Sequence, residues 1–320
     1  MKCSVIVTAY NQGTTIGQTL DSILAQKCDF PFEIIIGDDC STDGTKDICE
    51  KYRSKYPDIV HPLYHKQNGG VAINFVYSIA QAKGKYIAIC AADDFWHNAD
   101  KLQLEVDFLE KNSDYGMVYT DYDKLNAVNG KIIKNWLLTS NATTYEGGGL
   151  ITYFFLGRVP ALTLTVVFRH DLYEKYIPAD DYIKYKFPIE DWQTWLILSK
   201  YSHVGYLPIS TATYRYGQVS LSNPNNYEKI EEKYAREKFM YKYLCDLFPE
   251  DLLYDEKGYD NYVIHLLLSM AYKKKDFKSA KKYAKQLSAK GINAIKTRCA
   301  TNAILFYLFY YVRLMKNWLK

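Results

Sequence analysis

Two pairs of adjacent aspartates carry the clearest chemical potential in this 320-residue sequence. Asp93-Asp94 follows the apolar run KYIAICAA at an expected exposed strand end, and Asp38-Asp39 follows EIIIG. Adjacent carboxylates repel each other, and a divalent cation relieves the repulsion. Hard oxygen ligands suit Mg²⁺ or Mn²⁺, which in turn bridge phosphates. The structural alternatives are a helix N-cap near Ala99 and an Asx-turn before the helix that follows Asp39. Two such pairs at neighbouring strand ends favour a ligand site.

The elements that must position these acids alternate in the first third of the chain. Strands are expected over residues 4–10, 33–39, 60–65 and 85–94, with helices over 14–26, 44–56 and 72–82. This order predicts right-handed βαβ units and an α/β fold with a mostly parallel sheet flanked by helices. Ligands bind beyond the carboxyl ends of such strands, where Thr8, Tyr10 and the two acid pairs stand.

The rest of the chain predicts further strands and then a helical extension. Strands are expected over 116–120 and 163–168 and a helix around 191–201, and residues 228–320 are expected to be almost entirely helical. The turn-rich stretch SNPNN, which ends at Asn226, predicts a domain boundary. We therefore expect one domain over residues 1–222 and a basic helical region over 227–320.

Charge is distributed unevenly along the chain. The net charge is +4, but residues 270–320 hold 13 Lys and Arg against one Asp, so they carry +12 and residues 1–269 carry −8. A basic tail predicts an anionic partner. The apolar run 303–312 is too short to span a bilayer. Beside basic residues it predicts peripheral attachment to an anionic membrane surface rather than nucleic-acid binding. The alternative is that this run packs as ordinary core.

Several classes of protein are disfavoured by what the sequence lacks. It has no GxGxxG at a strand–helix junction, no GxxxxGK[ST] and no GxSxG, which disfavours dinucleotide oxidoreductases, P-loop enzymes and α/β-hydrolases. Seven cysteines without a CxxC pair are expected to be free thiols in a reducing compartment. Without a signal peptide or an apolar run of about 18 residues, we expect a cytoplasmic protein, peripheral at most to the inner face of the membrane.

The motifs, taken as a set, resemble the family 2 glycosyltransferases. SVIVTAYN, EIIIGDDCSTDGT, NGGVAINF, GKYIAICAADDFW and a late IEDW occur in the order and spacing of that family, over roughly residues 1–220. The resemblance implies a GT-A fold and an inverting enzyme. Such an enzyme moves a sugar from a nucleoside-diphosphate sugar, expected to be a UDP-sugar, to a hydroxyl of a glycan or lipid-linked acceptor in polysaccharide or cell-surface glycan synthesis.

The resemblance also implies roles for single residues. Thr8 and Tyr10 match residues that flank the nucleotide base, Asp39 matches the acid that accepts a hydrogen bond from the base, and Asn68 lies in the matching NGG segment. Asp93 and Asp94 match the region where one acid contacts the ribose or diphosphate and another binds Mg²⁺ or Mn²⁺. Asp191 matches the general base. Arg215, with Tyr214 and Ser220, matches a motif near the diphosphate.

Two departures from the family pattern reduce the implied metal ligand set. Ala91-Ala92 stands before the acid pair, where many members have Asp-x, and Tyr216-Gly217-Gln218 stands where a His often follows the YR motif. Two other functions stay open. A catalytically degenerate transferase would act as a binding module. A sugar-1-phosphate nucleotidyltransferase would need a Gly-rich loop with a Lys or Arg after the first strand, whereas TAYNQGTT has neither.

Overall fold

The computed structural model describes residues 1–217, 226–287 and 292–307. The chain divides into two compact units. The first comprises Met1–Gln218 with Glu250–Leu252, and the second comprises Val219–Pro249 with Leu253–Lys320. The expected boundary between residues 222 and 227 lies almost wholly outside the described residues.

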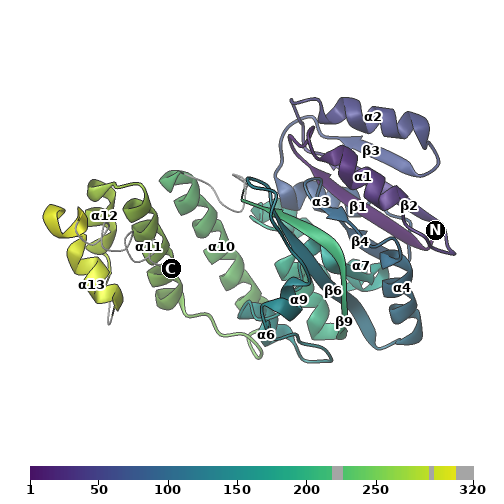
Figure 1. Ribbon diagram of the computed structural model, residues 1–320. Coiled ribbons are helices and arrows are strands. Elements are labelled where there is room, and N and C mark those ends of the chain that lie inside the picture. The colour runs from purple at the N-terminus through teal and green to yellow at the C-terminus, as the bar shows by residue number, and fades with distance from the viewer. Residues whose placement is uncertain (218–225, 288–291, 308–320) are drawn as a thin grey trace. The chain divides into compact units, whose positions relative to one another are not determined.

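The first unit is built on a nine-stranded sheet in the order β3-β2-β1-β4-β8-β6-β9-β5, with β7 paired to β6. Figure 1 labels β1, β2, β3, β4, β6 and β9 of this sheet. The strands are β1 (Cys3–Ala9), β2 (Phe32–Asp38), β3 (Val60–Tyr64), β4 (Tyr86–Ile89), β5 (Phe95–Trp96), β6 (Tyr115–Asn126), β7 (Ile132–Ile133), β8 (Val166–Arg169) and β9 (His203–Tyr216). The four strands β3, β2, β1 and β4 are parallel, as the βαβ pattern predicts. Beyond β4 the sheet is mixed, because β8 and β7 run antiparallel to their neighbours and β9 runs parallel to β6 but antiparallel to β5.

The helices between the first strands bury one face each. They are α1 (Ile16–Leu24), α2 (Thr45–Lys55), α3 (Val71–Ile79) and α4 (Lys101–Lys111). In α1 the buried side chains Ile16, Leu20 and Ile23 recur at helical spacing, so they form one stripe against the sheet. Helix α3 approaches β2 so closely that a Cβ on Gly37 would lie 2.1 Å from the side-chain oxygen of Asn74. Glycine is therefore required at the position before Asp38.

The second half of the first unit also contains short helices. They are α5 (Trp136–Thr139), α6 (Ile151–Phe155), α7 (His170–Tyr176), α8 (Ala179–Tyr185) and α9 (Trp192–Tyr201), together with the 3₁₀ turn η1 (Thr163–Thr165) before β8. Two expected strands are shorter than predicted. The strand over 85–94 ends at Ile89, because Asp94 closes a turn onto the carbonyl of Ala91. The strand over 163–168 begins only at Val166, after η1.

The second unit is helical in its described parts. It contains α10 (Tyr227–Leu247), α11 (Glu256–Lys273), α12 (Phe277–Ala284) and α13 (Ile292–Cys299), and Asn226, Asp255 and Asp276 cap the first three. Its core is a separate cluster in which Leu268, Tyr272 and Tyr283 are buried with Phe306. Of the apolar run 303–312, residues 303–307 are helical and the rest lies outside the described residues. No helix within the described ranges is long and apolar enough to cross a bilayer.

Candidate active site

The loops after β1 and β2 are fastened to each other. The Asn11 side-chain oxygen accepts the Thr42 N–H at 2.8 Å, and the Asn11 N–H donates to Ser41 Oγ at 2.8 Å. Asp43 accepts the Gly13 N–H and the Thr45 hydroxyl. These polar side chains therefore hold the loops in place. Thr8 is half-buried and Tyr10 is exposed at the same edge of the sheet.

Asp39 anchors the NGG segment after β3. Its two carboxylate oxygens accept the N–H groups of Gly69 and Gly70 at 2.8 and 2.9 Å, and only 3% of the residue is exposed. Gly70 has a φ of 90°, which glycine adopts without strain. Asn68 is exposed beside this turn. Each carboxylate oxygen has a second lone pair, so Asp39 can still accept a hydrogen bond from a ligand.

The acid pair after β4 is joined to β9 through Arg215. The Arg215 backbone N–H donates to Asp94 Oδ1 at 2.7 Å, and its guanidinium donates to the Asp93 carbonyl and to Gln18 Oε1, each at 2.7 Å. Thr19 in α1 donates its hydroxyl to the Asp94 carbonyl at 2.6 Å. Asp94 is only 5% exposed, so the expectation of an exposed position is wrong for this residue, because β9 covers it. Asp93 is half-buried.

The electrostatics of this pair fit a bound cation. Burial and the charge of Asp93 raise the pKa of Asp94 well above its usual range. Burial also raises the pKa of Asp93, with Arg215 opposing the shift. Within the described ranges, no group of three or more His, Cys, Asp or Glu residues could hold a metal ion. Two carboxylates still suit Mg²⁺, which commonly takes its other ligands from substrate phosphates and water.

Asp191 lies at the N-cap of α9 and has two hydrogen-bond donors. Its Oδ1 accepts the Trp192 N–H at 2.6 Å, and its Oδ2 accepts the hydroxyl of Thr163 in η1. Asp191 therefore caps α9 as well as standing where the family resemblance puts the general base. Burial and the charges of Asp94, Asp93 and Asp191 raise the pKa of the Tyr214 phenol in β9. All three carboxylates are therefore close enough to Tyr214 for their charges to act on its phenol.

Two residues of this site were not expected from the sequence. Glu190 is half-buried, and burial together with the charge of Asp191 raises its pKa to about 8. The IEDW motif could have indicated it. Thr163 carried no recognisable signal, because it precedes Asp191 by 28 residues and meets it only in the fold. Ser220, expected near the diphosphate, lies outside the described residues.

The mixed sheet flanked by helices has a GT-A type of fold. A crystal structure of Staphylococcus aureus TarS residues 1–349 in complex with UDP-GlcNAc matches with a TM-score of 0.57 and 20% identity, over 94% of this chain and 79% of that one. The mannosyltransferase PcManGT from Pyrobaculum calidifontis, in complex with GDP-Man and Mn²⁺, matches with a TM-score of 0.52 and 17% identity, over 97% and 83%.

The family follows from the sequence comparison. The profile of Glycosyl transferase family 2 matches residues 4–163, half of the chain, so the protein belongs to this family. The putative teichuronic acid biosynthesis glycosyltransferase TuaG of Bacillus subtilis is 34% identical over 143 residues, which cover 45% of this chain and 55% of TuaG. The chain covers between 21% and 55% of the length of this and other curated relatives.

Proposed function

We propose that the protein is an inverting glycosyltransferase that moves a sugar from a nucleoside-diphosphate sugar to a hydroxyl of a glycan or lipid-linked acceptor. The observation that carries the proposal is the acid pair Asp93-Asp94 after β4, which Arg215 of β9 holds through the Asp94 carboxylate and the Asp93 carbonyl. The names of TuaG and of the poly(ribitol-phosphate) β-N-acetylglucosaminyltransferase TarS support a role in cell-surface polysaccharide synthesis. A UDP-sugar is the first donor to test, since one TarS structure holds UDP-GlcNAc.

The donor would lie along the carboxyl edge of the parallel strands. Thr8 and the exposed ring of Tyr10 would flank the base, and Asp39 would accept its N–H while holding the turn beside Asn68. Asp93 and Asp94 would hold Mg²⁺ or Mn²⁺ at the diphosphate. When bound, the cation supplies charge stabilisation for the leaving group. Arg215, fixed against the same loop, adds positive charge there.

Asp191 would take the acceptor's proton. As the acceptor oxygen forms a bond to the anomeric carbon, the bond to the diphosphate breaks on the opposite face and the proton passes to the carboxylate. A hydroxyl is a weak nucleophile, so such a base contributes a factor of about 10²–10⁴ to the rate. Thr163 and the Trp192 N–H leave each Asp191 oxygen with lone-pair capacity for that proton.

A donor panel tests the proposal. Nucleotide sugars are incubated with the protein and Mg²⁺, Mn²⁺ or EDTA, and nucleoside diphosphate release is measured with and without acceptor glycans. We expect release with a divalent cation and none in EDTA. Asp191→Asn should keep nucleotide affinity and lose about 10²–10⁴-fold in rate, whereas Asp47→Asn on exposed α2 should match the wild type. Nucleotide binding without turnover of any donor would favour the degenerate binding module.

A second pair of variants addresses the cation. Asp93→Asn and Asp94→Asn both keep an oxygen acceptor, so Asp94→Asn can still receive the Arg215 N–H. Each should reduce cation-dependent turnover strongly while the far-ultraviolet circular dichroism stays unchanged. Full turnover of both variants, or turnover that EDTA does not affect, would rule out these residues as the metal site.

A further inference from the structure

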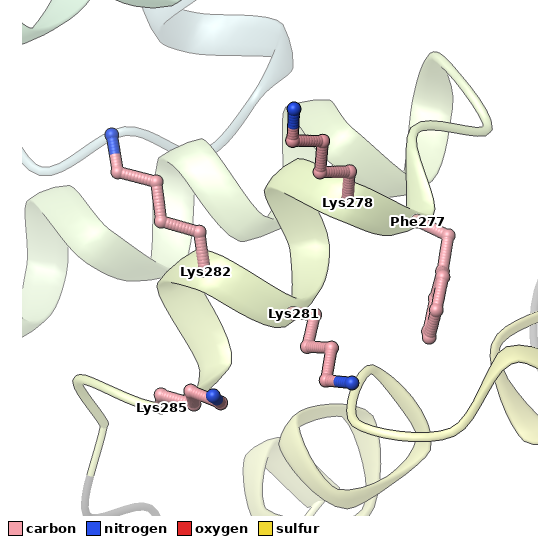
Figure 2. A pocket seen from close by; sticks show the side chains of 5 residues that line it. All are labelled: Phe277, Lys278, Lys281, Lys282 and Lys285. Carbon is pink, nitrogen blue, oxygen red and sulfur yellow. The ribbon is translucent and has the colours of Figure 1, made fainter.

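Helix α12 in the second unit presents a face of lysines. Its sequence FKSAKKYA contains no acid, and its buried face is formed by Ala280, Tyr283 and Ala284. The outward residues line a shallow hollow of about 340 Å³ (Figure 2). The four lysines of this face are Lys278, Lys281, Lys282 and Lys285, which we call the lysine face.

The lysine face gains little stabilisation from charge pairing within its helix. Its members stand three, four and seven residues apart, where like charges on a helix repel each other. Of these four lysines, only Lys282 forms an ion pair with another described residue, Glu231, at 3.1 Å. Helix α10 of the same unit is built differently, because Lys233 and Arg236 there are paired at i,i+4 spacing with Glu237 and Glu232. The unpaired charge of α12 is therefore available to an external anion.

An exposed apolar segment is fixed beside the start of this helix. Phe306 is fully buried, with its ring stacked on Tyr272 at 4.4 Å and lying 5.6 Å from the Phe277 ring. Its neighbours point outward, since Ile304 is 79% exposed and Leu305 is 44% exposed. The buried Phe306 thus fixes the segment near Phe277, the first residue of α12. Ile304 and Leu305 of this segment are exposed to water.

We propose that the lysine face, together with Ile304 and Leu305, docks the protein on an anionic lipid bilayer. A bilayer surface accepts both components, because its headgroups attract lysines and its acyl boundary takes up aliphatic side chains. A soluble polyanion would use only the lysines and would leave the aliphatic side chains in water. The inference rests on the second unit alone and does not depend on the proposed catalytic function.

Vesicle co-sedimentation of the full chain tests the lysine face. Vesicles contain either phosphatidylcholine alone or phosphatidylcholine with 30% phosphatidylglycerol. We expect the wild type to bind only the anionic vesicles. Lys278→Gln/Lys281→Gln/Lys285→Gln should bind about 100-fold more weakly, since each of the three lysines strengthens binding to an anionic surface by about fivefold. The matched control is Lys46→Gln/Lys51→Gln/Lys55→Gln, three exposed lysines of α2, and it should bind like the wild type.

A second pair of variants tests the apolar component. Ile304→Ser/Leu305→Ser should weaken binding to anionic vesicles, and most clearly in 0.5 M NaCl, where charge attraction is screened. Leu253→Ser/Leu247→Ser is the matched control, because these residues of the same unit are 90% and 43% exposed. Equal loss in both controls and both test variants would overturn the proposal. Wild-type binding to anionic vesicles by the lysine variant would also overturn it. A further contradicting outcome is tight binding to soluble polyphosphate, if Ile304→Ser/Leu305→Ser changes neither that binding nor the binding to vesicles.

Discussion

Asp191 is held by Thr163, a residue that takes no direct part in the proposed reaction. Thr163 donates its hydroxyl to one carboxylate oxygen, and the Trp192 N–H fixes the other. Because η1 and α9 meet only in the folded unit, this contact between them fixes the direction of the Asp191 carboxylate. Thr163 is therefore a positioning residue for the proposed base.

Replacing Thr163 tests that role. Thr163→Val keeps the shape but loses the donor, and we expect kcat to fall about tenfold, the equivalent of about 1.4 kcal/mol. The KM for the donor sugar should not change. Thr163→Ser should retain most activity. A serine variant as slow as the valine variant would point to packing instead.

The raised pKa of Glu190 leads to a separate prediction about how stability depends on pH. Burial and the charge of Asp191 raise its pKa from 4.5 to about 8 in the folded protein. Between those values the folded state holds a proton that the unfolded state has lost, so this residue's contribution to stability decreases as pH rises. Glu190→Gln lacks this titration and should gain stability relative to the wild type between pH 5 and pH 8. Urea unfolding at both pH values measures the difference, and an unchanged difference would contradict the assignment.

Helix α4 begins with a buried ion pair behind the acid pair. Lys101 binds Glu105, neither side chain is exposed, and the Lys101 ammonium lies 5.1 Å from the centre of the Trp96 ring. Trp96 follows Asp93-Asp94 by two residues, so α4 supports the loop that carries the proposed metal ligands. Burial raises the pKa of Glu105 to about 7 despite the opposing charge of Lys101.

Removing one partner of this pair should cost more than removing both. Lys101→Met leaves a buried carboxylate unpaired, and at pH 8 we expect a loss of about 3–5 kcal/mol in the free energy of unfolding. Lys101→Met/Glu105→Leu should recover most of that loss, because two apolar side chains need no partner there. Urea unfolding measures both variants. A double variant as unstable as the single one would show that the charges are needed together.

The first four strands could be predicted because each is a short apolar or β-branched run between turn residues. The ends of elements were harder to predict. The apolar residues continue past Ile89 through Cys90, Ala91 and Ala92. The strand nevertheless ends at Ile89, and the chain then forms the turn that carries Asp93 and Asp94. Strand direction beyond β4 could not be predicted either, because it depends on pairings between distant segments such as β6 and β9. Local periodicity contains no information on those pairings.

The grouping of functional side chains could likewise be predicted only in part. Acids at the ends of parallel strands could be placed together from the pattern alone, since those ends share one edge of the sheet. The contact between Arg215 and Asp94 spans 121 residues, and that between Thr163 and Asp191 joins a 3₁₀ turn to a helix cap. Family resemblance indicated Arg215 and Asp191, but their actual partners became visible only in the folded unit.

The two units have separate cores, which predicts two unfolding events. Val5, Ile36 and Leu102 belong to the buried cluster of the first unit, and Leu268 and Tyr272 belong to that of the second. All described residues of the proposed donor site lie in the first unit. In differential scanning calorimetry we expect two transitions, because each core can unfold cooperatively by itself.

Ligand binding should separate these transitions further. A nucleoside diphosphate with Mg²⁺ at 100 times its Kd stabilises the unit that binds it by about 2.7 kcal/mol, so only the transition of the first unit should move to higher temperature. Leu268→Ala, which opens a cavity in the second core, should lower the other transition alone and so identifies it. A single transition that shifts with both the ligand and Leu268→Ala would mean that the units unfold together, and the two cores would then not be independent.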